Sequence, residues 1–291
     1  MTTLSRLARI IGLLALSAAL AACSAIKLGY NNLDEIVYWW LDSYVDFTDE
    51  QAPRVREDLA RLHAWHRNEE LPRLAALLQG VETMAAAEVS PAQACAFVPR
   101  LRERVHAVAE RAEPAIVTLT VGMGPEQLAH LERKYGNNND KYRREWVRLA
   151  PAALHEKRFE QIVERSEMIY GPLEEAQRTV LRRQIEQSVF DPRQVLAERQ
   201  RRQRDAVQTL RKVTGPPAVT LIEARALVRG YLERAQASPD PAYRRYEQGV
   251  IEEGCRILSA LHNSASPAQR EAAVRRLRAY QRDLRELAAP P

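Results

Sequence analysis

The 291-residue sequence lacks the motifs that are typical of common enzyme families. It has no Gly-x-Ser-x-Gly elbow, no Walker loop and no Gly-x-Gly-x-x-Gly turn. It also has only three cysteines and 6% aromatic residues, and its apolar run from Ile10 to Leu20 is too short to span a bilayer as a finished helix. Hydrolase chemistry is therefore a poor expectation, and we predict a protein that is not an enzyme and has no cofactor.

The sequence also lacks strand patterns. No stretch alternates apolar and polar residues with period two between Asn-Gly or Asp-Gly turns, so we predict no sheet. Apolar spacing is helical instead: Val274, Leu277, Leu284 and Leu287 form one stripe. We predict an all-α fold, a multi-helix bundle of about ten helices after an N-terminal signal peptide. The expected helices lie near residues 31–46, 49–79, 91–119, 125–149, 152–169, 172–189, 192–213, 217–236, 240–262 and 267–287.

Six short segments carry a helix-start pattern. A capping residue, often followed by proline, precedes a glutamine or glutamate whose side chain can reach back to the N-cap amide. These segments begin at Thr48, Ser90, Gly124, Gly171, Asp191 and Ser266.

Proline, glycine and asparagine predict interruptions within these helices. We expect Pro72 to kink the second helix, and Pro99 and Pro114 to bend or divide the third. The run Gly-Asn-Asn-Asn-Asp at 136–140 should interrupt the fourth. Gly215-Pro216-Pro217 is a further break, which separates a main helical domain (31–214) from a C-terminal helical bundle (215–291) unless both form one domain.

Cys23 predicts where the mature protein resides. A basic start with Arg6 and Arg9, an apolar run and small residues lead into it, as in a secretory signal covering residues 1–22. Leu-Ala-Ala-Cys at 20–23 resembles the lipobox of bacterial lipoproteins, which implies a lipid on Cys23 and a tether over 23–30. In that class an aspartate after the cysteine commonly marks retention at the inner membrane. Ser24 therefore favours the outer membrane, with the body facing the periplasm.

Cleavage before Cys23 would leave 269 residues and remove two arginines, so the formal charge would fall from +5 to +3. A periplasmic protein meets anionic lipid and lipopolysaccharide and no nucleic acid. The stretch from Glu198 to Asp205 contains no apolar residue, so we expect it to face solvent or to contact such anionic lipid. Cys95 and Cys255 would remain, and an oxidising compartment favours a disulfide between them over two buried free thiols.

The segment after the tether concentrates aromatic residues and predicts a binding surface. Tyr38, Trp39, Trp40, Tyr44 and Phe47 lie within ten positions. They can sit at a membrane interface, line a groove for a partner, or form a core helix buried on several sides. The candidate partner-binding residues are Tyr38, Trp39, Trp40, Tyr44, Trp65 and His66.

One cluster is compatible with a metal. His63, His66, Glu69 and Glu70 fall within about two helical turns, and His at i and i+3 with Glu at i+7 can hold a divalent ion. No second cluster completes a site, so a helix face with ion pairs is the preferred interpretation and no metal ligand is assigned.

Several of these segments together resemble a known family. Cys23-Ser24, Lys27 to Asn32, Trp39 to Asp46, Gln51, Trp65-His66-Arg67 with Glu70-Leu71-Pro72, and Leu196 to Arg199 are similar to a family of uncharacterised Gram-negative lipoproteins, a domain of unknown function. The resemblance implies a helical fold and an envelope location, and no activity. Thr48 to Gln51 and Ser90 to Gln93 are also similar, more weakly, to the Leu-Thr-x-x-Gln repeats of periplasmic helical chaperones.

We therefore predict a lipid-anchored outer-membrane protein that binds another envelope protein or takes part in envelope assembly. One alternative is a chaperone-like binder of unfolded envelope proteins. Another is a metal-binding or enzymatic protein centred on His63 and His66.

Overall fold

The computed structural model describes residues 27–289, so the predicted signal peptide and Cys23 lie outside the described residues. The described part is a bundle of helices and contains no strand, which confirms the all-α prediction. Its helices are α2 (Leu33–Val45), α3 (Gln51–Trp65), α4 (Leu71–Met84), α5 (Pro91–Cys95), α6 (Phe97–Val121), α7 (Pro125–Tyr142), α8 (Pro151–Tyr170), α9 (Glu175–Glu186), α10 (Pro192–Thr214), α11 (Leu221–Gln236), α12 (Pro241–Ser264) and α13 (Pro267–Ala288), with π-helical turns η1 (His66–Glu70) and η2 (Arg143–Val147).

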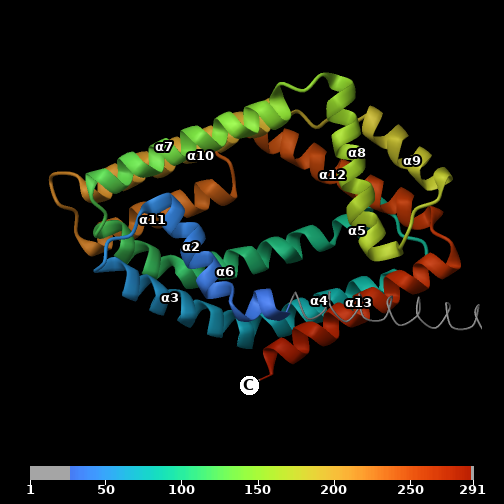
Figure 1. The fold of residues 1–291 in the computed structure, drawn as a ribbon, viewed down its shortest axis with the longest axis horizontal. Coiled ribbons are helices and arrows are strands. Elements are labelled where there is room, and N and C mark those ends of the chain that lie inside the picture. The colour runs from blue at the N-terminus through green and yellow to red at the C-terminus, as the bar shows by residue number, and fades with distance from the viewer. Residues whose placement is uncertain (1–26, 290–291) are drawn as a thin grey trace, which may run out of the picture.

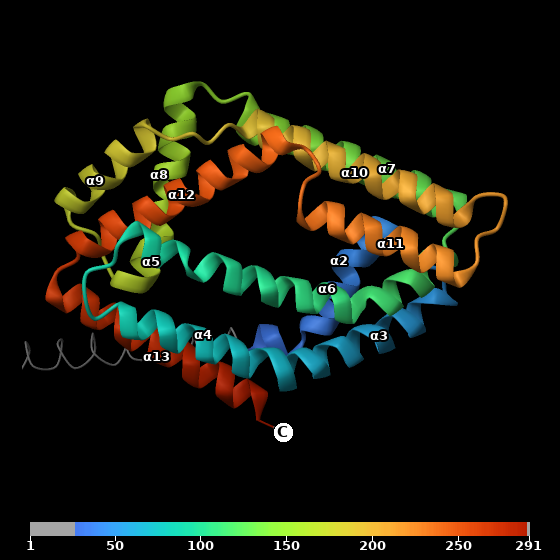
Figure 2. The ribbon, with the colours of Figure 1, turned by 180° about the vertical axis from the view of Figure 1, so that it is seen from behind.

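The helices form an elongated frame (Figure 1). Helices α4 and α13 lie side by side along one long edge, and α7 and α10 along the other. Helix α6 runs between these edges with α11 packed against it, and α8, α9 and α12 close one end (Figure 2). Helix α2 crosses one broad face and contacts both α3 and α7.

The helices after Gly215 pack mainly on earlier helices. Helix α11 contacts α6, α12 contacts α5 and α9, and α13 contacts α4 and α8. The break at 215–220 is present, and these contacts connect the helices on its two sides; the division into a main domain and a C-terminal bundle stays a prediction.

Three apolar clusters hold the described helices together, one of them around the buried Val89, Ala94 and Cys255. The largest joins α8, α9, α12 and α13 and includes Leu181 and Ile185, which are almost fully buried. Another joins α6, α10 and α11 around Ala224 and Val228. Helices of this length need such tertiary burial, because isolated helices are marginal in water.

Most predicted helix starts are confirmed. Ser90, Gly124 and Ser266 are N-caps, and the glutamine three positions later accepts a hydrogen bond from each cap amide. Asp191 caps α10 through the Arg193 amide. The start at Gly171 is wrong: Gly171 adopts a left-handed φ of 79° that ends α8, and α9 is capped by Glu174 instead.

The capping glutamines also bind one another in two pairs. Gln51 and Gln127 exchange amide hydrogen bonds of 3.3 and 2.7 Å between the starts of α3 and α7. Gln177 and Gln269 do the same at 2.8 and 3.0 Å between the starts of α9 and α13. The side-chain amide of each glutamine also donates to a backbone carbonyl just before the start of its partner's helix. The acceptor is the carbonyl of Gly122 for Gln51, of Asp46 for Gln127, of Ser264 for Gln177 and of Pro172 for Gln269.

The predicted interruptions are only partly right. Helix α7 runs unbroken through residues 136–140, because Asn138 and Asn139 hydrogen-bond to Tyr44 and Gln203 and are held by tertiary contacts. The third helix divides at Ala96, ahead of Pro99, and α6 continues through Pro114. Pro72 follows the π-helical turn η1, so the irregularity precedes the proline.

Candidate functional site

Helix α2 presents an exposed apolar face. Ile36, Trp39 and Trp40 are 52%, 61% and 58% exposed, and their spacing of three and four places them on one side of the helix. Leu28, 67% exposed, lies one turn before α2 in the helical segment 27–31. Adjacent exposed indoles are uncommon on a protein surface and mark binding sites more often than other residues do.

The opposite side of α2 anchors this face to the bundle. Tyr38 is buried, and the guanidinium of Arg56 on α3 lies 3.6 Å from its ring centre. Arg56 also pairs with Glu35 on α2. The expected core helix and the expected exposed surface therefore both exist on α2, on opposite sides.

The C-terminal end of α2 is fixed by hydrogen bonds. Asp46 adopts a left-handed φ of 59° and its amide donates to Asp42. The Asp46 carbonyl accepts from Gln127, and the Asp42 carboxylate accepts from the Phe47 amide. The glutamine pair at this end thus sets where α2 stops and how its exposed face is oriented.

Acidic side chains surround the exposed face. Glu35 and Asp46 have side chains that are 51% and 74% exposed, and Asp49 and Glu50 follow on the surface. Helix α2 itself contains no basic residue. Arg56 lies 5.2 Å from the Trp39 ring centre and pairs with Glu35, so the face is apolar at its centre, has a paired charge beside Trp39, and is followed along the chain by the carboxylates of Asp46, Asp49 and Glu50.

The other aromatic candidates are more enclosed. Tyr44 is half-buried, packs against Trp40 at 4.9 Å between ring centres, and accepts a hydrogen bond of 2.8 Å from Asn138. Trp65 is half-buried on α3, with Arg111 of α6 5.9 Å from its ring centre. Tyr44 therefore supports the α2 face, whereas Trp65 belongs to the contact between α3 and α6.

Tyr30 contacts both His66 and His63. The Tyr30 hydroxyl lies 2.8 Å from Nδ1 of His66, and its ring packs edge-on against His63 at 4.8 Å. Burial lowers the pKa of both histidines and raises the pKa of Tyr30 to about 12. All three side chains are therefore neutral near pH 7. Their contacts connect the chain before α2 to the end of α3 and to η1. Sequence reasoning missed Tyr30, although it lies in the quoted segment Lys27 to Asn32.

Glu69 and Glu70, the carboxylates of the predicted cluster, pair with arginines and not with His63 or His66. Glu70 is buried and bound by Arg73 and Arg104 at 2.6 and 3.4 Å, while Glu69 pairs with Arg73. Within residues 27–289, no three or more histidine, cysteine or acidic side chains come together as metal ligands. The four residues of the predicted cluster therefore form ion pairs and contacts with Tyr30, and they do not converge on one site.

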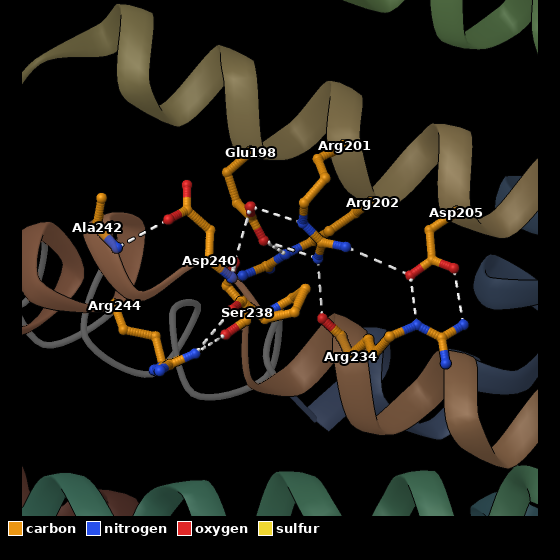
Figure 3. A network of polar contacts seen from close by, with 10 residues as sticks. Glu198, Arg201, Arg202, Asp205, Arg234, Ser238, Asp240, Ala242 and Arg244 are labelled. Atoms are coloured by element: carbon orange, nitrogen blue, oxygen red, sulfur yellow. Dashed lines mark hydrogen bonds and ion pairs between the residues drawn. The ribbon is translucent and has the colours of Figure 1, made fainter.

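The polar stretch from Glu198 to Asp205 is largely a connection between helices (Figure 3). Glu198 is 5% exposed and bound by Arg201, Arg202 and Ser238. Burial acts to raise the pKa of Glu198, but the hydrogen bonds from the two arginines outweigh it and hold the pKa below its usual range. Arg234 of α11 pairs with Asp205 at 2.7 Å. The expectation of a wholly solvated stretch is wrong at Glu198, because the polar groups satisfy one another inside the protein.

Cys95 and Cys255 are joined by a disulfide with a Cα–Cα distance of 5.5 Å. The bond connects α5 to α12 across 160 positions of sequence, beside the buried Val89 and Ala94.

No helix of the described region is both long enough and apolar enough to cross a bilayer. Comparisons with curated proteins and with solved structures found no match. A comparison with family models matched residues 43–222, which span α3 to α10 and include the end of α2. The match covers more than half of the chain, so the protein belongs to the family of unknown function DUF6279.

Proposed function

We propose that this protein is an outer-membrane lipoprotein, anchored through Cys23 and facing the periplasm, that binds another envelope protein through the exposed face of α2. The observation that carries the proposal is the pair of exposed indoles, Trp39 and Trp40, on the helix nearest to the predicted lipid. The role is one of binding and envelope assembly, without catalysis.

The anchor would hold this face close to the membrane. Lys27 pairs with Asp283 at 3.1 Å and with Glu286, which ties the start of the described chain to α13. Cys23 lies four positions before Lys27, a reach of about 14 Å when fully extended. A partner bound to α2 would therefore sit next to the membrane, as expected for a protein embedded in it or assembled on it.

Charge favours a protein over the lipid surface as the occupant of this face. An anionic membrane would be repelled by the exposed carboxylates of Asp46, Asp49 and Glu50, whereas Glu35 is paired with Arg56. A protein with an apolar pocket and a basic edge would complement both the indoles and these carboxylates. The disulfide between Cys95 and Cys255 supports an oxidising compartment such as the periplasm.

Site-specific photo-crosslinking in intact cells tests the partner. The crosslinking residue replaces Trp40, and in a control it replaces Ile222, which is 83% exposed on α11. We expect one dominant protein adduct from position 40 and not from position 222. Adducts with lipid alone would contradict the proposal, and a broad spread of unfolded clients would favour the chaperone alternative instead.

Metabolic labelling tests the anchor separately. Cells given radioactive palmitate should label the protein, and Cys23→Ser should abolish labelling and release the protein from the membrane fraction. Labelling that persists in Cys23→Ser would contradict the anchor without bearing on the α2 surface.

A further inference from the structure

A second apolar region lies away from α2, where α4, α8, α12 and α13 meet. It is a cavity of about 340 Å³ with aliphatic walls. Ligand pockets in proteins span roughly 300–1,000 Å³ and are mostly apolar. Leu258, which is 45% exposed, lines the cavity and lies at its mouth. The other aliphatic walls include Val81, Met84, Ile169 and Leu277.

Three of the polar side chains that line this cavity, those of His262, Tyr170 and Ser166, already have hydrogen-bond partners. Nδ1 of His262 lies 2.9 Å from the Tyr170 hydroxyl, and Nε2 lies 2.8 Å from the carbonyl oxygen of Ala87. A proton on Nε2 therefore lets His262 donate to Ala87 and accept from Tyr170. The Ser166 hydroxyl donates to the Ile162 carbonyl. Arg165 also lines the cavity but is exposed, and the remaining walls are mainly aliphatic, so the part of a ligand that lies against those walls must be apolar.

A basic cavity adjoins the apolar one. It has a volume of about 680 Å³, and Ala85 lines both cavities at the end of α4. Three arginines line this second cavity, against one acidic residue. Two of the arginines have partners, because Arg275 faces Glu271 at 3.5 Å and Arg278 pairs with Glu82 at 2.7 Å.

Arg270 is the arginine left for a ligand. Its Nε is buried and has no hydrogen-bond partner among residues 27–289, and its terminal nitrogen makes one bond of 3.3 Å to the Asn263 carbonyl. Asn263 directly follows His262, which lines the apolar cavity, so this bond holds the Arg270 side chain at the boundary between the two cavities. A buried guanidinium nitrogen without an acceptor is costly unless a ligand supplies one.

We propose that the two cavities together bind an anionic amphiphile with a single apolar chain. The chain occupies the space between α4, α8, α12 and α13, and the head group accepts hydrogen bonds from Arg270. Both a fatty acid and a lysophospholipid have this chemistry. The site is separate from the α2 face and holds whether or not α2 binds a protein.

Photo-labelling of the full protein in membranes tests this site. Two probes carry a diazirine in the acyl chain, one a fatty acid and the other lysophosphatidylglycerol. We expect saturable labelling of peptides from α4, α8, α12 and α13, with the stronger probe identifying a carboxylate or a phosphate head group. Excess unlabelled hexadecanoate should compete better than hexadecanol, which has the same chain without the charge.

Two substitutions sharpen the test. Leu258→Trp fills the mouth of the cavity, and Arg270→Gln removes the charge, which should weaken labelling about tenfold because a charge-assisted hydrogen bond is lost. Arg54→Gln, at the exposed start of α3, is the matched control and should label normally. Thermal unfolding identifies any variant that has lost its fold. Labelling scattered over the surface, or labelling unchanged by both substitutions in folded protein, would overturn the proposal.

Discussion

The two ends of the molecule are held by the same arrangement in different surroundings. At one end Gln51 and Gln127 join α3 to α7, and at the other Gln177 and Gln269 join α9 to α13 (Figure 1). Gln177 is 2% exposed, whereas Gln51 is half-exposed. Because an unsatisfied amide costs more when buried, equal hydrogen bonds should stabilise the two ends unequally.

Other features also indicate that the end with Gln177 is the more strongly stabilised one. The end with Gln177 also contains the largest apolar cluster and lies near the disulfide. The end with Gln51 contains α2, whose indoles face solvent. One end therefore has most of the stabilising contacts, and the other has the exposed surface that we propose binds a partner.

The disulfide should give the largest effect on stability. Replacing both cysteines, in Cys95→Ala with Cys255→Ala, removes a covalent link across 160 positions. In the chain-entropy model, closing a loop of this length stabilises the fold by about 4 to 5 kcal/mol. Urea unfolding of the double variant should show most of this loss, and a loss below about 1 kcal/mol would contradict the prediction.

The buried glutamine pair should come next. Gln177→Ala leaves the Glu174 amide uncapped and the Gln269 amide without its partner, which should cost about 2 to 3 kcal/mol. Gln177→Ala combined with Gln269→Ala should cost less than the sum of the single changes, because both remove the same hydrogen bonds. Strict additivity in urea unfolding would show that the pair is not coupled.

The glutamine pair at the other end should matter less, because Gln51 is partly exposed although Gln127 is 7% exposed. Gln51→Ala should cost about 1 kcal/mol, because water can reach the Thr48 amide and the Gly122 carbonyl that lose their hydrogen bonds. Gln93→Ala is the matched control, since Gln93 caps α5 from an exposed position. If Gln51→Ala destabilises as much as Gln177→Ala, burial does not distinguish the two ends.

Mild acid should have the smallest effect, and the part due to His262 can be isolated by substitution. Burial lowers the pKa of His262, so the unfolded chain binds a proton more readily than the folded protein. The stability due to neutral His262 is complete above pH 6.5 and declines as the pH falls from 6.5 towards the folded-state pKa. His262→Gln should therefore reduce the loss of stability between pH 7.5 and pH 6.0, whereas His106→Gln, at an exposed position, should leave it unchanged.

Local patterns allowed most of the fold to be predicted from the sequence. Pro and capping residues marked helix starts at Ser90, Gly124 and Ser266, because a helix start depends on four or five adjacent residues. The run at 136–140 misled the prediction, since contacts with Tyr44 and Gln203 outweigh the turn preference of asparagine. The π-helical turns were not predicted, because no residue type marks them.

The candidate site was predictable only in part. Sequence alone located the aromatic segment but could not tell that Tyr38 faces inward while Trp39 and Trp40 face outward, since that depends on where α3 and α7 lie. The capping pattern identified Gln269 but missed Gln177, and it did not indicate that the two glutamines meet, because 92 positions separate them. The apolar cavity was missed for the same reason, as its walls come from four helices.

The disulfide also determines how the chain would respond to a cut. Any single cleavage between residues 96 and 254 leaves two fragments joined through Cys95 and Cys255. On a gel without reductant, a nick anywhere in α6 to α11 would leave the protein at its full mass. A nick before residue 95 or after residue 255 would release a fragment, so more than half of the backbone can be cut once while the molecule stays in one covalent piece.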